Sequence, residues 1–246
     1  MFGTSIPINL IKGSMLYFYV DLLGMNAVVF ATVYAVYGVL DAIDNPLFGF
    51  LSDRTRTRWG RRKPYLMVGA GVLLLGCIAL FAVPDAVAAD ATSLVIWFTV
   101  FAILSEMADS VINVNYGALL PELFPKEKVR ASANALRQGF QLVAMILSLG
   151  LTPILAQNVL GCQVDDAACA DPTIGYERLA IIFAVLGVGV IIYMATGVRE
   201  NPQVEHEVRP AFFRSIGQIL GNRHFWTIGV VNACFGAAMA LVLNGL

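Results

Sequence analysis

The sequence predicts an all-α membrane protein, and three observations point to that fold class. The chain has 246 residues, of which 58% are hydrophobic and 13% are charged, whereas a soluble domain usually carries about 25% charged residues. Its mean hydropathy is +0.74. Apolar segments of about 20 residues, the length that crosses a bilayer as a helix, recur along the chain and alternate with polar connectors.

Seven segments match a membrane-spanning helix in length and composition. They comprise residues 2–23, 27–51, 65–83, 94–120, 131–155, 179–198 and 225–246. The first is the weakest match, because Lys12 lies inside it. The start of the chain has no basic residues before its apolar stretch and no small-residue cleavage motif, so we interpret it as a retained span and not as a signal peptide.

Basic residues occur in every second connector, which places them on one side of the predicted bundle. Lys and Arg gather between the second and third, the fourth and fifth, and the sixth and seventh segments. The intervening connectors, "PDAVAADATS" and "QNVLGCQVDDAACADPTIGYER", hold almost none. By the positive-inside rule, the basic connectors and the N-terminus lie in the cytoplasm. We therefore expect an integral protein of the plasma membrane, or of the inner membrane of a bacterium.

Composition excludes several other classes of protein. The net charge of −1 gives no basic excess for nucleic acid, and both histidines, His206 and His224, fall in one polar connector. No Gly-rich phosphate loop and no His/Cys cluster with metal-ligand spacing is present. We expect no catalytic residues, no metal site, no cofactor and no enzymatic activity. Cys162 and Cys169 share the acidic outer connector, either as a disulfide or as two thiols.

Two acids interrupt the second apolar segment. A charge near the centre of a bilayer costs about 2.5–3.5 kcal/mol on insertion scales, so it needs a partner, an ion or water. Asp41 and Asp44 are three residues apart on one helix and Asn45 follows, which clusters oxygen atoms of the kind that bind a hard cation or a proton. The alternative is structural, with Asp44 forming a hydrogen bond with backbone that Pro46 frees.

A polar stripe marks the fourth segment. Glu106, Asp109 and Asn113 are spaced three and four residues apart, so they lie on one side of a helix. Intramembrane polar residues on one face indicate a substrate or ion site. The alternative is interhelical hydrogen bonding that holds the bundle together.

The stretch "GFLSDRTRTRWGRRKP" follows the acids of the second segment and carries a dense set of cations. We expect these cations at the cytoplasmic surface. The positions that define its motif are Gly49, Asp53, Arg54, Gly60, Arg61 and Arg62. They resemble the loop signature of the major facilitator superfamily, in which a loop acid and arginines are implied to gate the cytoplasmic side. Alternatively, these cations set the membrane topology of the chain and contact anionic lipid.

The longer spacing of this loop resembles that of the glycoside–pentoside–hexuronide:cation symporter family. "LLPELFPKEKVRASANALRQGF" resembles that family's next basic connector, and Arg137 matches an arginine of its central cavity. The resemblance implies residues 1–198 as a six-helix N-terminal half, 199–224 as a cytoplasmic linker with an amphipathic helix, and 225–246 as a seventh helix that begins a truncated second half. It also implies a glycoside-like substrate at Glu106, Asp109, Asn113 and Arg137, with H⁺ or Na⁺ held by Asp41, Asp44 and Asn45.

The sequence departs from the family pattern at several positions. The family has acids where this chain has Ser5, Asn45 and Asn113, and an arginine where it has Gly38. A missing acid at the cation site favours proton coupling, or no coupling. Two alternatives stay open, a lysolipid carrier of the same fold and a half-transporter without activity of its own, which would need a C-terminal half as partner.

Overall fold

The computed structural model describes residues 2–161 and 173–198, with residues 221–223, 226–227, 230–231 and 234 of the C-terminal segment. The side chains at positions 39 and 41–43 are outside this description. Cys162, Cys169, the expected surface helix at 211–220 and most of the expected seventh span also lie outside the described residues. The chain divides into two compact units, Met1–Pro202 and Gln203–Leu246. In the second unit, Thr227 Oγ1 donates to the Arg223 carbonyl at 3.1 Å, one helical turn earlier.

The described part of the first unit consists of helices and short connectors and contains no strand, which confirms the predicted all-α class. Its elements are α1 (Phe2–Leu16), η1 (Tyr17–Leu22), α2 (Ala27–Arg54), α3 (Lys63–Phe81), α4 (Asp85–Ala88), α5 (Ala91–Leu123), α6 (Glu127–Ile154), η2 (Leu155–Val159) and α7 (Thr173–Gly197). The π-helices η1 and η2 continue α1 and α6 without a break. Each of the first six expected spans therefore coincides with one helical segment, and only the short α4 was not expected.

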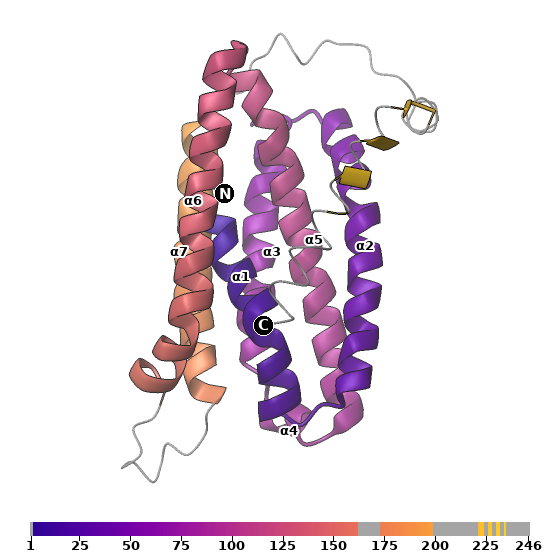
Figure 1. Ribbon diagram of the computed structural model, residues 1–246, viewed down its shortest axis with the longest axis vertical. Coiled ribbons are helices and arrows are strands. Elements are labelled where there is room, and N and C mark those ends of the chain that lie inside the picture. Colours follow the sequence, from indigo (N-terminus) through magenta and orange to yellow (C-terminus); the bar gives the residue numbers. More distant parts are fainter. Residues whose placement is uncertain are drawn as a thin grey trace. The chain divides into compact units, whose positions relative to one another are not determined.

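The long helices of this unit lie side by side (Figure 1). Helix α1 contacts α6 and α7, α3 contacts α5 and α7, and α2 contacts α5. Buried aromatic rings fill the bundle near α4, where Phe18 packs edge-on against Phe81 with ring centroids 5.0 Å apart. The Tyr19 hydroxyl, buried beside them, donates to the Leu80 carbonyl at 2.8 Å. The polar end of this tyrosine is thus satisfied within the core.

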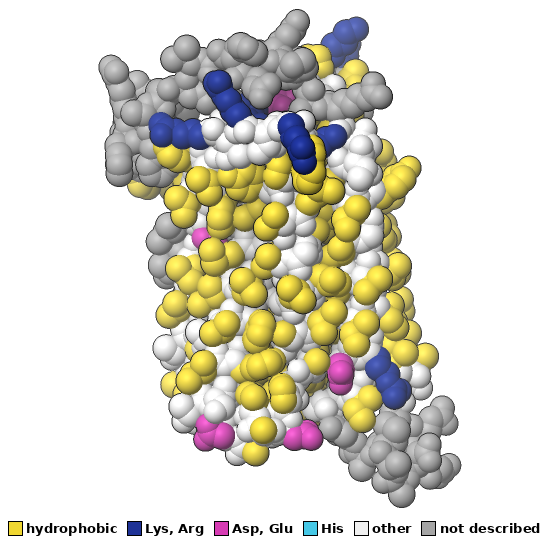
Figure 2. Space-filling model, turned by 180° about the vertical axis from the view of Figure 1, so that it is seen from behind, with side chains coloured by type: hydrophobic (Ala, Val, Ile, Leu, Met, Phe, Trp, Pro, Cys, Tyr) yellow, Lys and Arg dark blue, Asp and Glu magenta, His cyan; other side chains and the backbone are white. Residues whose placement is uncertain are grey.

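The outer surface is that of a membrane protein. Among the described residues, α3, α5, α7 and the continuous segment Glu127–Val159 are long and apolar enough to cross a bilayer. Figure 2 shows hydrophobic side chains over the flank of the bundle, with Lys and Arg gathered mainly toward one end. Several helices contain a proline, at Pro7, Pro46, Pro121 and Pro153. Membrane-spanning helices tolerate proline when neighbouring groups form hydrogen bonds with the backbone that it frees.

Small residues set the closest helix contacts. A methyl group added at Gly3 of α1 would lie 2.6 Å from the carbonyl oxygen of Gly187 on α7. At Gly76 of α3, an added methyl would collide with the side chain of Ser105 on α5. Glycine lets these backbones approach closely, as is common between helices in lipid. The interface of α1 with α7 thereby fixes the position of α1, which carries Lys12 into the bundle.

Candidate functional site

A tight turn places the two motif arginines, Arg61 and Arg62, at the start of α3. Gly60 has a φ of 106°, in the left-handed region that glycine adopts without strain. Its N–H donates to the Thr57 carbonyl at 3.0 Å, and the Thr57 hydroxyl donates back to the Gly60 carbonyl at 2.5 Å. The chain reverses here, so that Arg61 and Arg62 point back toward the ends of α2 and α5.

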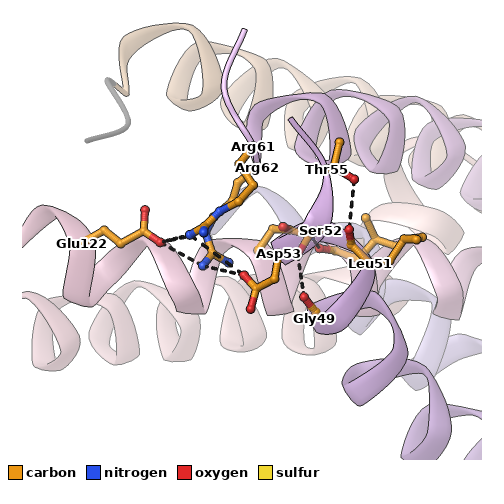
Figure 3. A network of polar contacts seen from close by, with 10 residues as sticks. Gly49, Leu51, Ser52, Asp53, Thr55, Arg61, Arg62 and Glu122 are labelled. Carbon is orange, nitrogen blue, oxygen red and sulfur yellow. Dashed lines mark hydrogen bonds and ion pairs between the residues drawn. The ribbon is translucent and has the colours of Figure 1, made fainter. Parts of the chain in front are cut away.

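An ionic cluster joins three helices at this end of the bundle (Figure 3). We define it as Asp53, Arg61, Arg62 and Glu122. Arg61 Nη2 lies 2.5 Å from Glu122 Oε1. Arg62 reaches the same oxygen through Nε at 3.1 Å and Nη2 at 2.9 Å, and donates to Asp53 Oδ1 at 3.3 Å. Two cations face two acids, so the cluster is neutral as a whole.

Burial of this cluster corrects one expectation. All the cations of the segment were expected at the surface, but Arg61 is 6% exposed and Arg62 is 5% exposed. The physical reason is Glu122 at the end of α5, whose side chain is 11% exposed and supplies the charge that makes burial tolerable. Arg54 is exposed as expected, with its guanidinium 4.1 Å from the ring centroid of Phe50, and it does not join the cluster.

Gly49 lies one turn before Asp53 and supports the cluster through α2. Its carbonyl accepts from Ser52 Oγ at 3.1 Å. A methyl group at Gly49 would lie 3.4 Å from Val114 Cγ1 on α5, an ordinary contact distance. This glycine therefore marks the contact of α2 with α5, but nothing about that contact requires glycine.

A second polar cluster lies in the middle of the bundle. We define the central triad as Lys12 of α1, Tyr37 of α2 and Glu106 of α5. The Lys12 ammonium lies 3.6 Å from Glu106 Oε2, and the Tyr37 hydroxyl donates to the same oxygen. The ammonium also lies 5.8 Å from the centroid of the Tyr37 ring. Glu106 is 3% exposed, so a buried carboxylate is held by one cation and one hydroxyl.

An aromatic row leads to the triad along α2. The Tyr34 and Tyr37 rings stack with centroids 5.2 Å apart, and the Phe30 ring stacks on Tyr34 at 6.0 Å. Phe30 in turn stacks on Phe98 of α5 at 5.1 Å. Tyr34 is 40% exposed, whereas Tyr37 is 6% exposed. The row therefore places one accessible ring, that of Tyr34, next to the charged triad.

The polar stripe predicted on α5 is present, but its members have different surroundings. Asn113 Nδ2 donates to Asp109 Oδ1 at 2.6 Å, within the helix. Glu106 instead reaches across to α1 and α2. The stripe thus combines a local hydrogen bond with an interhelical ion pair.

The expected cation site on α2 is brought together only in part. Asp44 is 6% exposed, whereas Asn45 is an exposed residue of the same helix. The helix passes through Asp41, whose side chain lies outside the described part of the structure. Among the described residues, no group of three or more His, Cys, Asp or Glu side chains is placed to hold a metal ion.

Arg137 of α6 lines a separate cavity of about 210 Å³. The walls are mainly apolar and come from α1, α5, α6 and α7; they include Phe2, Thr4, Ile112, Tyr116, Phe140, Ile191 and Met194. Arg137 Nε is buried and has no hydrogen-bond partner among the described residues. The cavity therefore offers one cationic donor at the edge of an apolar space.

Sequence reasoning missed three members of these clusters. The sequence alone singled out neither Glu122 nor Tyr37, and Lys12 only made the first segment a weaker match to a membrane span. The sequence signal for the central triad was the lone cation Lys12 in one apolar segment and the acids of another, which include Glu106, since a charged residue in lipid requires an opposite partner.

A helical bundle with apolar flanks, an ionic cluster at one end and a charged triad at its middle is the architecture of an integral membrane protein. Residues 2–246 match the family described as MFS/sugar transport protein. The chain belongs to this family of the major facilitator superfamily, which confirms the resemblance drawn from the loop motif.

Curated relatives agree with this assignment. The chain is 29% identical over 223 residues to an uncharacterized symporter of Synechocystis, covering 89% of this chain and 39% of that protein. It is 26% identical to the isoprimeverose transporter of Lactiplantibacillus pentosus, over 82% of this chain and 40% of that protein. An uncharacterized symporter of Bacillus subtilis is also 26% identical, over 82% and 42% respectively. The chain spans about 40% of the length of these relatives.

Proposed function

We propose that this chain forms half of a secondary active transporter that moves a sugar or glycoside-like solute across the membrane by alternating access. The proposal rests on the polar residues of the central triad and of the α5 stripe, which lie inside an otherwise apolar bundle. The chain also belongs to a family of sugar transport proteins. Polar residues are costly at this depth, which favours a role in binding. One relative is named as an isoprimeverose transporter, which supports a saccharide as substrate.

In this proposal the polar residues of the bundle have two roles, contact with the substrate and binding of the coupling cation. Glu106, Asp109 and Asn113 on α5 contact the substrate, together with Arg137 on α6. Asp41, Asp44 and Asn45 on α2 hold the coupling cation, H⁺ or Na⁺. The burial of Asp44 supports an ion-binding role, because a buried carboxylate needs a compensating charge.

The ionic cluster acts as part of a cytoplasmic gate. It links the ends of α2 and α5 through Arg61 and Arg62. The exposed cations beside it favour a cytoplasmic location for this end by the positive-inside rule. We expect Asp53→Ala to slow net transport while substrate binding persists, as measured by uptake into proteoliposomes and by ligand-induced thermal stabilisation. Loss of binding in a folded protein would contradict a gating role.

Uptake by the full-length transporter in proteoliposomes tests the main proposal. A panel of radiolabelled saccharides is offered with an inward proton gradient, an inward sodium gradient or neither. We expect at least one saccharide to accumulate only with one of the gradients. The proposal fails if no saccharide enters in any of the three conditions.

A lysolipid or similar amphiphile is a second candidate substrate. The Arg137 cavity favours it, because its walls are mainly apolar and it has one cationic donor, an arrangement that suits an acyl chain with an anionic head. The same uptake assay with a labelled lysophospholipid separates the two. Uptake of the lysolipid without uptake of any saccharide would favour this candidate.

A further inference from the structure

The connector between α2 and α3 presents an exposed aromatic and basic surface before it reaches the ionic cluster. We define the loop surface as Arg54, Arg58 and Trp59. Trp59 is 58% exposed, and both arginines are exposed residues. Among the described residues, neither arginine takes part in an ion pair. The loop surface therefore has a positive charge that the ionic cluster does not neutralise.

Hydrogen bonds order the backbone of this connector. Thr55 Oγ1 lies 2.6 Å from the Tyr65 hydroxyl of α3, which ties the start of the connector to the next helix. The Trp59 N–H donates to Thr57 Oγ1 at 3.3 Å, and the same hydroxyl donates to the Gly60 carbonyl at 2.5 Å. Because the backbone on both sides of Trp59 is already ordered, binding a ligand there costs little conformational entropy.

The two arginines of the loop surface each lie against an aromatic ring. The guanidinium carbon of Arg58 is 5.5 Å from the centroid of the Trp59 ring, and that of Arg54 is 4.1 Å from the centroid of the Phe50 ring. A guanidinium stacks on a ring through its flat face, and its N–H donors point along its edges, where they match the oxygens of a phosphate. The loop surface thus combines two phosphate-binding groups with an exposed apolar ring.

Helix α3 sets the depth of the loop surface in the membrane. This span has 19 residues, so at 1.5 Å per residue it is about 28 Å long, close to the thickness of about 30 Å of a hydrocarbon core. Its first residue, Lys63, therefore lies at the edge of that core when the helix spans it. Trp59 comes shortly before Lys63, on the turn that leads into the helix. This level is that of the lipid headgroups, where Trp side chains are enriched.

We propose that the loop surface binds the headgroup of an anionic phospholipid, with the lipid phosphate on Arg58, the Trp59 ring at headgroup level and Arg54 adding to the local positive charge. The exposed cations favour a cytoplasmic location for this end of the bundle, and the cytoplasmic leaflet carries the anionic lipids. A zwitterionic headgroup offers the same phosphate, but its own cation is repelled by the arginines, so the anionic headgroup is preferred. The inference concerns the surrounding lipid and does not depend on the transported solute.

Native mass spectrometry of the full-length transporter tests the proposal. The purified protein is titrated with palmitoyl-oleoyl phosphatidylglycerol or with the matching phosphatidylcholine, and the affinity for the first bound lipid is measured. We expect the double variant Arg58→Gln/Trp59→Ala to bind the first phosphatidylglycerol about fivefold or more weakly than the wild type, the loss expected when a cation beside anionic lipid is removed. Phosphatidylcholine should bind equally to the two proteins.

Two further variants separate a specific site from general attraction to charge. Arg58→Lys keeps the charge but loses the planar set of donors, so we expect an affinity between those of the wild type and of the double variant. Lys128→Gln removes an exposed cation of α6 outside the loop surface, and should bind the first phosphatidylglycerol as the wild type does. All the changed side chains are exposed, so the variants should fold as the wild type does.

The position of the Trp59 ring is measured separately, by quenching of its fluorescence in lipid vesicles. The vesicles contain phosphatidylglycerol and phosphatidylcholine whose acyl chains are brominated either near the headgroup or near the chain end. The difference in emission between the wild type and Trp59→Phe isolates the contribution of Trp59. We expect stronger quenching by bromine near the headgroup than by bromine near the chain end.

Several outcomes would overturn the proposal. An unchanged affinity for the first phosphatidylglycerol in the double variant would show that the loop surface does not bind it, and an equal loss in Lys128→Gln would reduce the effect to general charge attraction. Displacement of the lipid by an equal concentration of glycerol phosphate would identify a site for soluble phosphate instead. Absence of quenching would place the Trp59 ring in water or against another segment of the full-length protein.

Discussion

The buried charges of the ionic cluster and the central triad are tolerated because each has an opposite partner nearby. Glu122 shows this most clearly, since one of its oxygens contacts both Arg61 and Arg62. Asp53 is a weaker partner, because its side chain is 38% exposed and its contacts to the two guanidinium groups are 4.0 and 3.3 Å. The buried arginines therefore depend on Glu122 more than on Asp53.

This difference predicts a ranking of variants in the ionic cluster. Removing one partner of a buried ion pair typically costs about 3–5 kcal/mol, so Glu122→Gln should lower the thermal midpoint of the purified protein strongly. Asp53→Asn should lower it less, because an exposed pair contributes about 0–1 kcal/mol. Arg56→Gln removes an exposed cation and serves as control. A larger loss for Asp53→Asn than for Glu122→Gln would contradict the ranking.

The sequence singled out several residues of the ionic cluster and the central triad, but not all of the side chains that contact them. Glu106 could be singled out because an acid in an apolar segment is conspicuous, and the motif spacing singled out Arg61 and Arg62. Their partners are distant along the chain: α2, α3 and α4 lie between the helices of Lys12 and Glu106, and α3 and α4 lie between Arg61 and the helix of Glu122. Which helices lie side by side depends on tertiary packing, and the hydropathy of the sequence does not indicate it.

At the scale of helices, close approach is controlled by glycine at α1 and α7. A methyl group at Gly187 would collide with the Gly3 carbonyl oxygen and lie 3.1 Å from Pro7 Cδ, whereas a methyl at Gly189 would meet nothing within 4 Å. Two glycines of one helix, two positions apart, thus have opposite surroundings. Of these two glycines, only Gly187 packs closely against a neighbouring helix.

Alanine at these two positions should act in opposite directions. Gly189→Ala removes glycine's entropic cost in a helix and should raise stability by about 0.5–1 kcal/mol. Gly187→Ala should lower it by about 1–3 kcal/mol, the usual cost of overpacking, because a backbone carbonyl cannot move aside. Thermal unfolding in one detergent compares the two directly. Stabilisation by both substitutions would show that α1 and α7 are not in close contact at Gly187.

At the start of α5, outside the membrane-spanning part, Asp90 makes a pH-dependent contribution to the stability of the fold. Asp90 accepts from the Ser93 N–H at 2.8 Å and from the Ser93 hydroxyl at 2.7 Å. The bond from the Ser93 hydroxyl, followed by that from its backbone N–H, lowers the pKa of Asp90 below its usual value. The stabilisation is therefore complete above the unfolded-state pKa of about 3.9 and is lost as the pH falls through the lower folded-state value.

Substitution of this cap isolates its pH dependence. Asp90→Asn keeps an oxygen that accepts from the backbone but cannot titrate. Its stability should therefore match the wild type more closely at low pH than at pH 7, as measured by thermal midpoints between pH 3 and pH 7. Parallel pH profiles for the two proteins would show that Asp90 does not contribute in this way.

Helix positions were predictable because each follows from one physical requirement, a run of apolar residues long enough for the bilayer. The six expected spans of the first unit match α1 with η1, α2, α3, α5, α6 with η2, and α7 to within a few residues. The short α4 was missed, because a single turn after Pro84 has no hydrophobic period to reveal it. The turn at Gly60 depends on backbone conformation, which a glycine in a basic loop suggests but does not specify.

For the molecule as a whole, the proposed coupling ion and the proposed gate lie on the same helix. Helix α2 carries Asp41, Asp44 and Asn45 before Asp53, which lies at the helix end in the ionic cluster. From Asp44 to Asp53 the rise is about 14 Å. A charge bound at the acids is therefore placed to influence an element that also holds the gate, as ion-coupled alternation requires.

Loss of the first acid on α2 should separate coupling from reorientation. We expect Asp41→Asn in the full-length transporter to abolish accumulation driven by an ion gradient, because the coupling cation loses its charged ligand. Exchange of labelled for unlabelled substrate should persist, because exchange needs only the loaded carrier to reorient. Asp85→Asn, at an exposed acid near α4, controls for loss of charge alone. Proteoliposomes with an imposed gradient measure both quantities, and accumulation by Asp41→Asn equal to that of the wild type would place the coupling ion elsewhere.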